Sequence, residues 1–109
     1  MRGELVRYGR LLYERGYVVA ADGNLSVREG DRVLITPSQV AYDAVGEDDL
    51  AELTLEGEVV HGKPSSERAV HLAVYRARPE VAAIVHAHPV HACALAVLGS
   101  PLPALLERA

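Results

Sequence analysis

The sequence of 109 residues contains no tryptophan and no phenylalanine, and it has a single cysteine and a single lysine. Five tyrosines are its only aromatic residues, so aliphatic side chains must fill most of the core. Because Cys93 has no second cysteine to pair with, an intrachain disulfide is excluded, which favours a reducing compartment. We expect Cys93 to be a small buried residue rather than a metal ligand.

Clusters of basic residues and long apolar runs are also missing. The net charge is −4 and Lys and Arg are scattered, which argues against binding to a nucleic-acid backbone. No apolar stretch is long enough to cross a bilayer. Charges spread through residues 1–20 do not match the apolar region of a signal peptide. We therefore expect a soluble, cytoplasmic protein with no nucleic-acid or membrane partner.

The overall composition is that of a folded protein, and the length favours a single domain that spans residues 1–109. Apolar spacing and turn residues predict a helix, four strands joined largely by hairpins, a helix, a strand and a helix, at residues 3–15, 25–28, 32–35, 52–55, 58–60, 67–77, 81–86 and 90–98. The continuous apolar run at 81–86 is typical of a buried strand. This order predicts a mixed α/β domain whose sheet is largely antiparallel.

His86 ends the run at 81–86, and His88 follows two positions later. Alternate residues of a strand point to the same face, so His86 and His88 present two imidazoles side by side, and Pro89 then turns the chain. Converging neutral imidazoles suit Zn²⁺ or another divalent transition metal. Two half-exposed histidines on an edge strand would show the same spacing.

Glu67 favours the metal interpretation. It opens a helix after a Pro-Ser-Ser turn, where free backbone N–H groups and the helix dipole stabilise a carboxylate. A carboxylate is a common partner of two histidines in catalytic zinc sites, and it can also act as a general base. A first-turn glutamate that only complements the helix dipole is the alternative.

Three turns carry groups that suit an anion. Gly23 and Asn24 form a turn whose N–H groups can surround one. Ser65 and Ser66 add hydroxyl and N–H groups at a helix N-terminus, and Thr36 and Ser38 supply further hydroxyls. Each turn alone is weak evidence of a site. Together with a metal they predict a phosphorylated substrate.

Four short motifs, taken in order, resemble the class II aldolase/adducin family and in particular its L-fuculose-phosphate aldolase branch: Gly23-Asn24-x-Ser26-x-Arg28, Thr36-Pro37-Ser38, Ser65-Ser66-Glu67 and His86-x-His88-Pro89. The resemblance extends from the first helix to Leu98. It implies an α/β/α sandwich around a mainly antiparallel sheet. It also implies a homo-oligomer, usually a fourfold-symmetric tetramer, with active sites between neighbouring subunits.

The resemblance also implies roles for single residues. His86 and His88 would bind one Zn²⁺ per chain, and Glu67 would be the catalytic acid/base and a further possible ligand. The substrate phosphate would be held by Gly23, Asn24, Ser38, Ser65 and Ser66. The implied reaction is cleavage of a ketose 1-phosphate, such as L-fuculose 1-phosphate, to dihydroxyacetone phosphate and an aldehyde. Zinc would act as a Lewis acid, with no Schiff base on Lys63.

Two departures from the family pattern stand out. Gln39 occupies a position that is usually glycine, which puts a backbone of positive φ and the phosphate contact of that loop in doubt. Relative to the family we also expect the chain to be truncated at its C-terminus, because family members continue into a third zinc histidine and a C-terminal tyrosine acid. We expect none of His61, His71 and His91 to replace that histidine, and His71 to be structural.

Other activities stay open at this stage. The epimerase branch typically has a lysine where this chain has Thr36, which favours aldolase. Dehydratase and decarboxylase relatives share the histidine pair. A non-catalytic, adducin-like or remnant domain is the alternative from a different class, and retention of Glu67, His86 and His88 argues against it.

Overall fold

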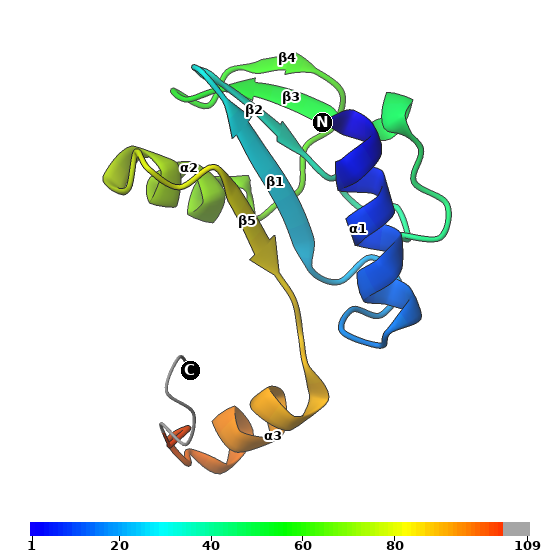
Figure 1. Cartoon of the computed structure of the whole chain (residues 1–109), viewed down its shortest axis with the longest axis vertical. Helices are drawn as coiled ribbons and strands as arrows, with labels where there is room; N and C mark the ends of the chain where they lie inside the picture. Colours follow the sequence, from blue (N-terminus) through cyan, green and yellow to red (C-terminus); the bar gives the residue numbers. More distant parts are fainter. Residues whose placement is uncertain (104–109) are drawn as a thin grey trace.

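The computed structural model describes residues 1–103. Its elements are three helices, one short 3₁₀ helix and five strands: α1 (Arg2–Glu14), β1 (Asn24–Glu29), β2 (Arg32–Ile35), η1 (Glu47–Asp49), β3 (Ala51–Thr54), β4 (Val59–His61), α2 (Arg68–Ala77), β5 (Ala83–His86) and α3 (Val90–Leu98). The strands form one sheet in the order β4-β3-β2-β1-β5, and every neighbouring pair is antiparallel (Figure 1). The predicted α/β class with an antiparallel sheet is confirmed.

The sheet is covered on both faces, because alternate strand residues point to opposite sides. On one face Leu34 packs with Leu5 of α1 in a cluster that also contains Leu25 and Leu50. On the other face Val33 and Ile35, its neighbours in β2, pack with two residues of α2 in a second cluster that contains Leu72 and Tyr75. The β1–β2 hairpin thus lies between two helices.

The strand β5, which pairs with β1 on the side away from β2, is less buried than its sequence predicts. The prediction of a buried strand over 81–86 is wrong: β5 spans only Ala83–His86, and its residues are exposed or half-buried. In the described part of the chain β5 is an edge strand that pairs with β1 alone. The apolar run therefore predicted a strand correctly, but it did not predict the burial of that strand.

The helix α3 lies away from the sheet at the end of an extended segment that follows β5 (Figure 1). None of its residues is buried, and Gly99 ends it in the left-handed conformation with φ 68°. Cys93, expected to be buried, is only half-buried for this reason. Among residues 1–103, no helix has the length and apolar character needed to cross a bilayer.

Candidate active site

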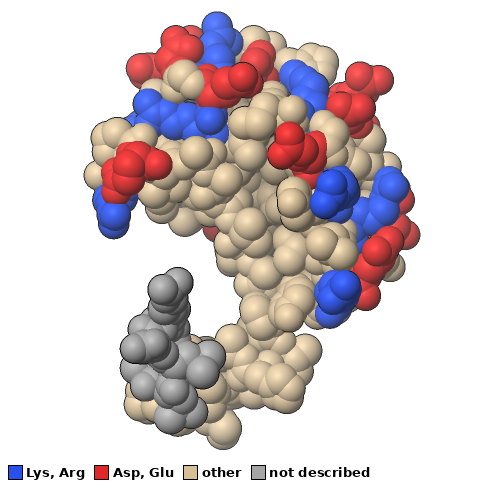
Figure 2. All heavy atoms as spheres, in the orientation of Figure 1, with Lys and Arg blue, Asp and Glu red and all other residues tan. Residues whose placement is uncertain are grey.

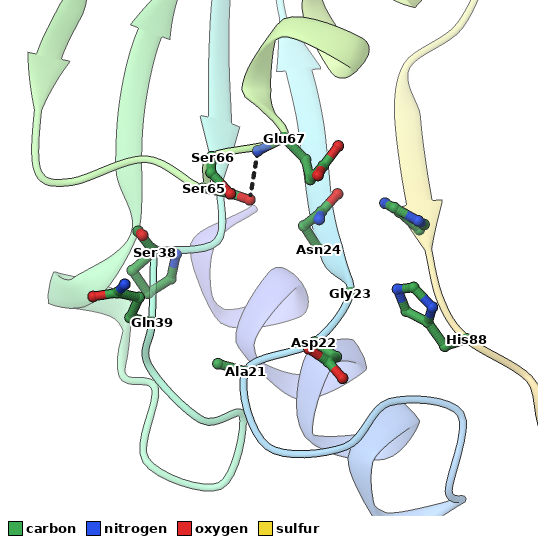
Figure 3. A pocket seen from close by; sticks show the side chains of 12 residues that line it. Ala21, Asp22, Gly23, Asn24, Ser38, Gln39, Ser65, Ser66, Glu67 and His88 are labelled. Carbon is green, nitrogen blue, oxygen red and sulfur yellow. Dashed lines mark hydrogen bonds between the residues drawn. The ribbon is translucent and has the colours of Figure 1, made fainter.

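A cavity of about 460 Å³ lies where residues of the four sequence motifs meet. Four segments line it: residues 21–24 before and at the start of β1, residues 37–39 after β2, residues 65–67 before α2, and two histidines at the end of β5 (Figure 3). All eight predicted site residues border this cavity: Gly23, Asn24, Ser38, Ser65, Ser66, Glu67, His86 and His88. The fold therefore brings together motifs that are up to 65 positions apart in the sequence.

His86 and His88 lie side by side in the cavity wall. Their ring centroids are 5.1 Å apart and the ring planes are tilted by 34°. His86 is held by the sheet, where it pairs with Asn24, and the main-chain N–H of His88 donates to the carbonyl of Tyr17 at 2.9 Å. Two imidazoles are thus fixed side by side by their backbones.

Glu67 approaches from the opposite side of the cavity. Its N–H donates to Ser65 Oγ at 3.2 Å, which fixes the start of α2. Its carboxylate is exposed and points toward the strand segment that carries His88 (Figure 3). Within residues 1–103, however, no three His, Cys, Asp or Glu side chains are close enough together to hold a metal ion. The imidazole pair is preorganised, whereas Glu67 would have to move to become a ligand.

The donor types nevertheless suit zinc. Two imidazoles and one carboxylate on a common cavity match the nitrogen and oxygen ligands that catalytic zinc sites use. The other histidines do not add to this set: His61 in β4 and His91 at the start of α3 are exposed and lie outside the cavity lining.

The loops at Ser38 and Ser65 offer fewer free backbone donors than their sequence suggests. The Ser38 N–H donates to the Lys63 carbonyl at 3.0 Å, and the Ser65 N–H donates to the Thr36 carbonyl at 3.1 Å. These bonds join the two loops beside a bridge between Pro37 and Pro64. Side-chain hydroxyls are therefore the groups that these loops present to a ligand.

Two further residues of these motifs have defined roles. Thr36 is buried and its Oγ1 accepts a hydrogen bond from the Leu25 N–H at 3.2 Å, so it ties β2 to β1 rather than facing the cavity. Gln39 does adopt a positive φ of 60°, so the loop keeps the conformation that glycine favours despite its side chain. Ala21 and Asp22 also line the cavity, although they lie outside the four motifs.

His71 lies beneath the site rather than in it. It is 1% exposed. Its ring forms hydrogen bonds with the side chains of Asn24 and Ser26 in β1. Burial is the main cause that lowers the pKa of His71 to about 4; the nearby charge of His86 acts in the same direction, and the Glu67 carboxylate partly offsets both. The imidazole is therefore neutral at pH 7, in agreement with the expectation that His71 is structural.

The fold and the cavity together define a class of protein: an antiparallel sheet between helices, with imidazole, carboxylate and hydroxyl groups gathered at loop ends. A family model described as the class II aldolase and adducin N-terminal domain matches residues 3–109. The chain belongs to the class II aldolase/adducin family.

Individual relatives are enzymes that act on sugar phosphates or related phosphorylated acids. The L-fuculose phosphate aldolase of Methanocaldococcus jannaschii is 39% identical over 102 residues, which cover 94% of this chain and 56% of that protein. The 3-oxo-tetronate 4-phosphate decarboxylase of Haemophilus influenzae is 46% identical over 96 residues, which cover 86% of this chain and 46% of that protein. The chain spans about half the length of these relatives.

A solved structure of an L-fuculose 1-phosphate aldolase matches the fold with a TM-score of 0.89 at 39% identity. The match covers 94% of this chain and 50% of that one. The predicted family, and the predicted sheet and helix arrangement, are therefore confirmed.

Proposed function

We propose that the chain carries the metal-binding and phosphate-binding part of an aldolase active site that cleaves a ketose 1-phosphate of the L-fuculose 1-phosphate type. The products would be dihydroxyacetone phosphate and an aldehyde. The observation that carries the proposal is the single cavity shared by the imidazole pair, Glu67 and the serine and asparagine groups. L-fuculose phosphate aldolases among the relatives support the choice of substrate.

His86 and His88 would hold one zinc ion, with Glu67 as a further ligand when its exposed side chain moves toward them. When bound, zinc supplies a Lewis acid that polarises the substrate carbonyl. Asn24 and the hydroxyls of Ser38, Ser65 and Ser66 would bind the phosphate. Ser38 lies across the cavity from His88 (Figure 3), which would separate the anionic end of the substrate from the reacting carbon.

Glu67 would move the proton. In cleavage, a base takes the proton of the substrate hydroxyl while the adjacent carbon–carbon bond breaks, and an acid then protonates the carbon of the three-carbon product. The exposed carboxylate at the start of α2 can exchange protons with substrate or solvent in both steps. Such a chain would work in the cytoplasm as a homo-oligomer, by resemblance a tetramer.

Decarboxylation is the second candidate activity, because the relative from Haemophilus influenzae is named for it and both reactions leave negative charge on carbon next to a carbonyl. The two are separated by product: an aldolase releases dihydroxyacetone phosphate, and a decarboxylase releases carbon dioxide. An adducin-like domain would bind no zinc and do neither, and epimerase or dehydratase activity would release neither product.

The test starts with metal content, because zinc retention is measured without any turnover. Purified chain incubated with zinc and then desalted should retain one zinc per chain. His86→Ala and His88→Ala should each lose it, while the exposed control His61→Ala should keep it. Absence of zinc in the unmodified chain would overturn the proposal in favour of a non-catalytic domain.

Activity is measured next with L-fuculose 1-phosphate, by coupled detection of dihydroxyacetone phosphate. Glu67→Gln removes the proton-transfer group and keeps the size of the side chain, so it should reduce any measured kcat by a factor of about 10² to 10⁴. Unchanged turnover in Glu67→Gln would remove this residue from the mechanism.

A further inference from the structure

Four buried polar side chains form a hydrogen-bonded row that extends from the interior to the cavity. Tyr75, in α2, bonds Ser26 Oγ at 2.7 Å. Ser26 Oγ also bonds His71 Nδ1 at 2.6 Å, and His71 Nε2 bonds Asn24 Oδ1. Their exposed fractions are 0%, 1%, 1% and 3% in that order. Only Asn24 among the four borders the cavity.

The hydrogen bonds of this row can be satisfied in one direction, from Tyr75 toward His71 and from His71 to Asn24. An amide oxygen can only accept, so His71 Nε2 donates to Asn24 Oδ1, and the neutral ring leaves Nδ1 as an acceptor. Ser26 then donates to Nδ1, and the Tyr75 hydroxyl donates to Ser26 Oγ. Each proton has an acceptor.

The opposite direction leaves one proton without an acceptor. There, the Asn24 amide nitrogen would donate to the ring, the ring to Ser26, and Ser26 to Tyr75. Among the described residues, Ser26 is the hydrogen-bond partner of the Tyr75 hydroxyl, so the buried Tyr75 proton would go unpaired. An unmet buried donor costs about 1–3 kcal/mol, which favours the first direction.

We propose that His71 is a positioning residue, which fixes the Asn24 carboxamide with its oxygen turned inward and its two N–H groups available to the cavity. At Asn24 the cavity wall then presents only hydrogen-bond donors. It therefore binds an anionic oxygen in preference to a cation or to a hydroxyl group that needs an acceptor. The inference rests on the proposed function only in naming that anion as the substrate phosphate.

The imidazole proton is observed directly by ¹⁵N–¹H NMR of the full chain at pH 7. The expected spectrum places the proton of the His71 ring on Nε2 and gives Nδ1 the shift of an unprotonated nitrogen. A proton on Nδ1 would overturn the proposal, because Asn24 would then have to turn its oxygen to the cavity. This readout requires neither zinc nor turnover, so it can fail or succeed independently of the aldolase activity.

Binding of inorganic phosphate tests the consequence, with zinc content matched between variants. Glutamine can place an N–H near the position of Nε2, so His71→Gln should keep the affinity within about threefold. His71→Leu should weaken it about tenfold or more, by loss of an oriented donor to an anion. Equal weakening in both variants would mean that His71 only fills space, and would overturn the proposal.

Asn24→Asp tests the Asn24 donors while keeping an acceptor for the buried ring. Aspartate still accepts from His71 Nε2, but it presents a carboxylate oxygen to the cavity in place of an N–H donor. Phosphate affinity should fall about a hundredfold or more while the circular dichroism spectrum is unchanged. Phosphate binding as tight as in the unmodified chain would show that the Asn24 donors do not face the ligand.

Discussion

Gly23 lies against the main-chain carbonyl of His86, so closely that a Cβ atom on residue 23 would stand 2.7 Å from that oxygen. The same atom would stand 2.6 Å from a side-chain carbon of Val18. Gly23 also has a φ of 78°, which disfavours other residues. The turn that opens β1 and the strand that carries the imidazole pair are therefore fitted to each other through the absence of a side chain.

Gly23→Ala should therefore destabilise the chain by about 3 kcal/mol or more, from left-handed strain together with the clash. Gly16→Ala is the matched control, because Gly16 has a φ of 76° and a Cβ atom added there would meet nothing within 4 Å. Its cost should be about 1 kcal/mol. Urea unfolding measures both, and equal losses would show that the contact with His86 is not tight.

A second close approach lies in α1. A Cβ atom on Gly9 would stand 2.7 and 3.0 Å from two ring carbons of the buried Tyr42. In most helix interiors Gly→Ala stabilises by up to about 1 kcal/mol. Here overpacking of about 1–3 kcal/mol opposes that gain, so Gly9→Ala should be net destabilising by about 1–2 kcal/mol.

Gly3→Ala, in the same helix, is the control for this prediction. Its Cβ would meet only the Glu47 side chain, at 3.5 Å, which is ordinary contact distance. It should be neutral or stabilising by up to about 1 kcal/mol. A thermal midpoint that rises for Gly9→Ala as it does for Gly3→Ala would contradict the packing of α1 on Tyr42.

The sequence predicted the ends of the elements better than their surroundings. The hairpin between β1 and β2 and the start of α2 next to Glu67 followed from local turn chemistry, which a sequence contains in full. Local chemistry does not specify what covers an edge strand, so the exposure of β5 was missed. It also could not show that the Ser38 and Ser65 N–H groups bond to neighbouring loops, because those partners come from distant parts of the chain.

The same distinction holds at the site. The spacing of His86 and His88 in a strand sufficed to predict adjacent rings. Asp22 was missed because turn aspartates are common, and the Ser26–Tyr75 contact was missed because it joins a strand to a helix 49 positions later. Resemblance placed the four motifs in one site, and tertiary structure supplied the bonds beneath them.

The buried His71 ring predicts how stability depends on pH. Its pKa is about 4 in the folded chain, lowered from an ordinary 6.5 mainly by burial. Between these values the unfolded chain binds more protons, so stability is fully present above pH 6.5 and is lost as the pH falls toward 4. The loss between pH 7.5 and 5.0 should be about 2 kcal/mol.

Urea unfolding at these two pH values gives the measurement. His71→Gln has no group that titrates there and should lose about that much of the pH dependence. His61→Gln removes an exposed histidine and should leave the dependence unchanged. A pH dependence that persists in His71→Gln would assign the titration to another group.

The segment from β5 to the end of α3 carries exposed apolar side chains. Residues 81–103 contain no Asp, Glu, Lys or Arg, and Figure 2 shows the corresponding uncharged surface around the segment that leads to α3. Val85, Val97 and Leu98 are 58%, 87% and 78% exposed. Apolar surface of this kind favours association, so the chain should form oligomers in multi-angle light scattering.

Charge introduced at this surface should disperse the oligomer. Val97→Lys combined with Leu98→Glu leaves the net charge unchanged and places two ionised groups in the expected contact between chains. The measured mass should therefore move toward that of one chain. Val19→Lys charges a valine that is 68% exposed elsewhere and should leave the assembly intact. Because zinc binding is assigned to residues outside α3, the dispersed variant should still retain zinc. A monodisperse monomer before any substitution would contradict the prediction, and would leave the exposed face of α3 without a role in assembly.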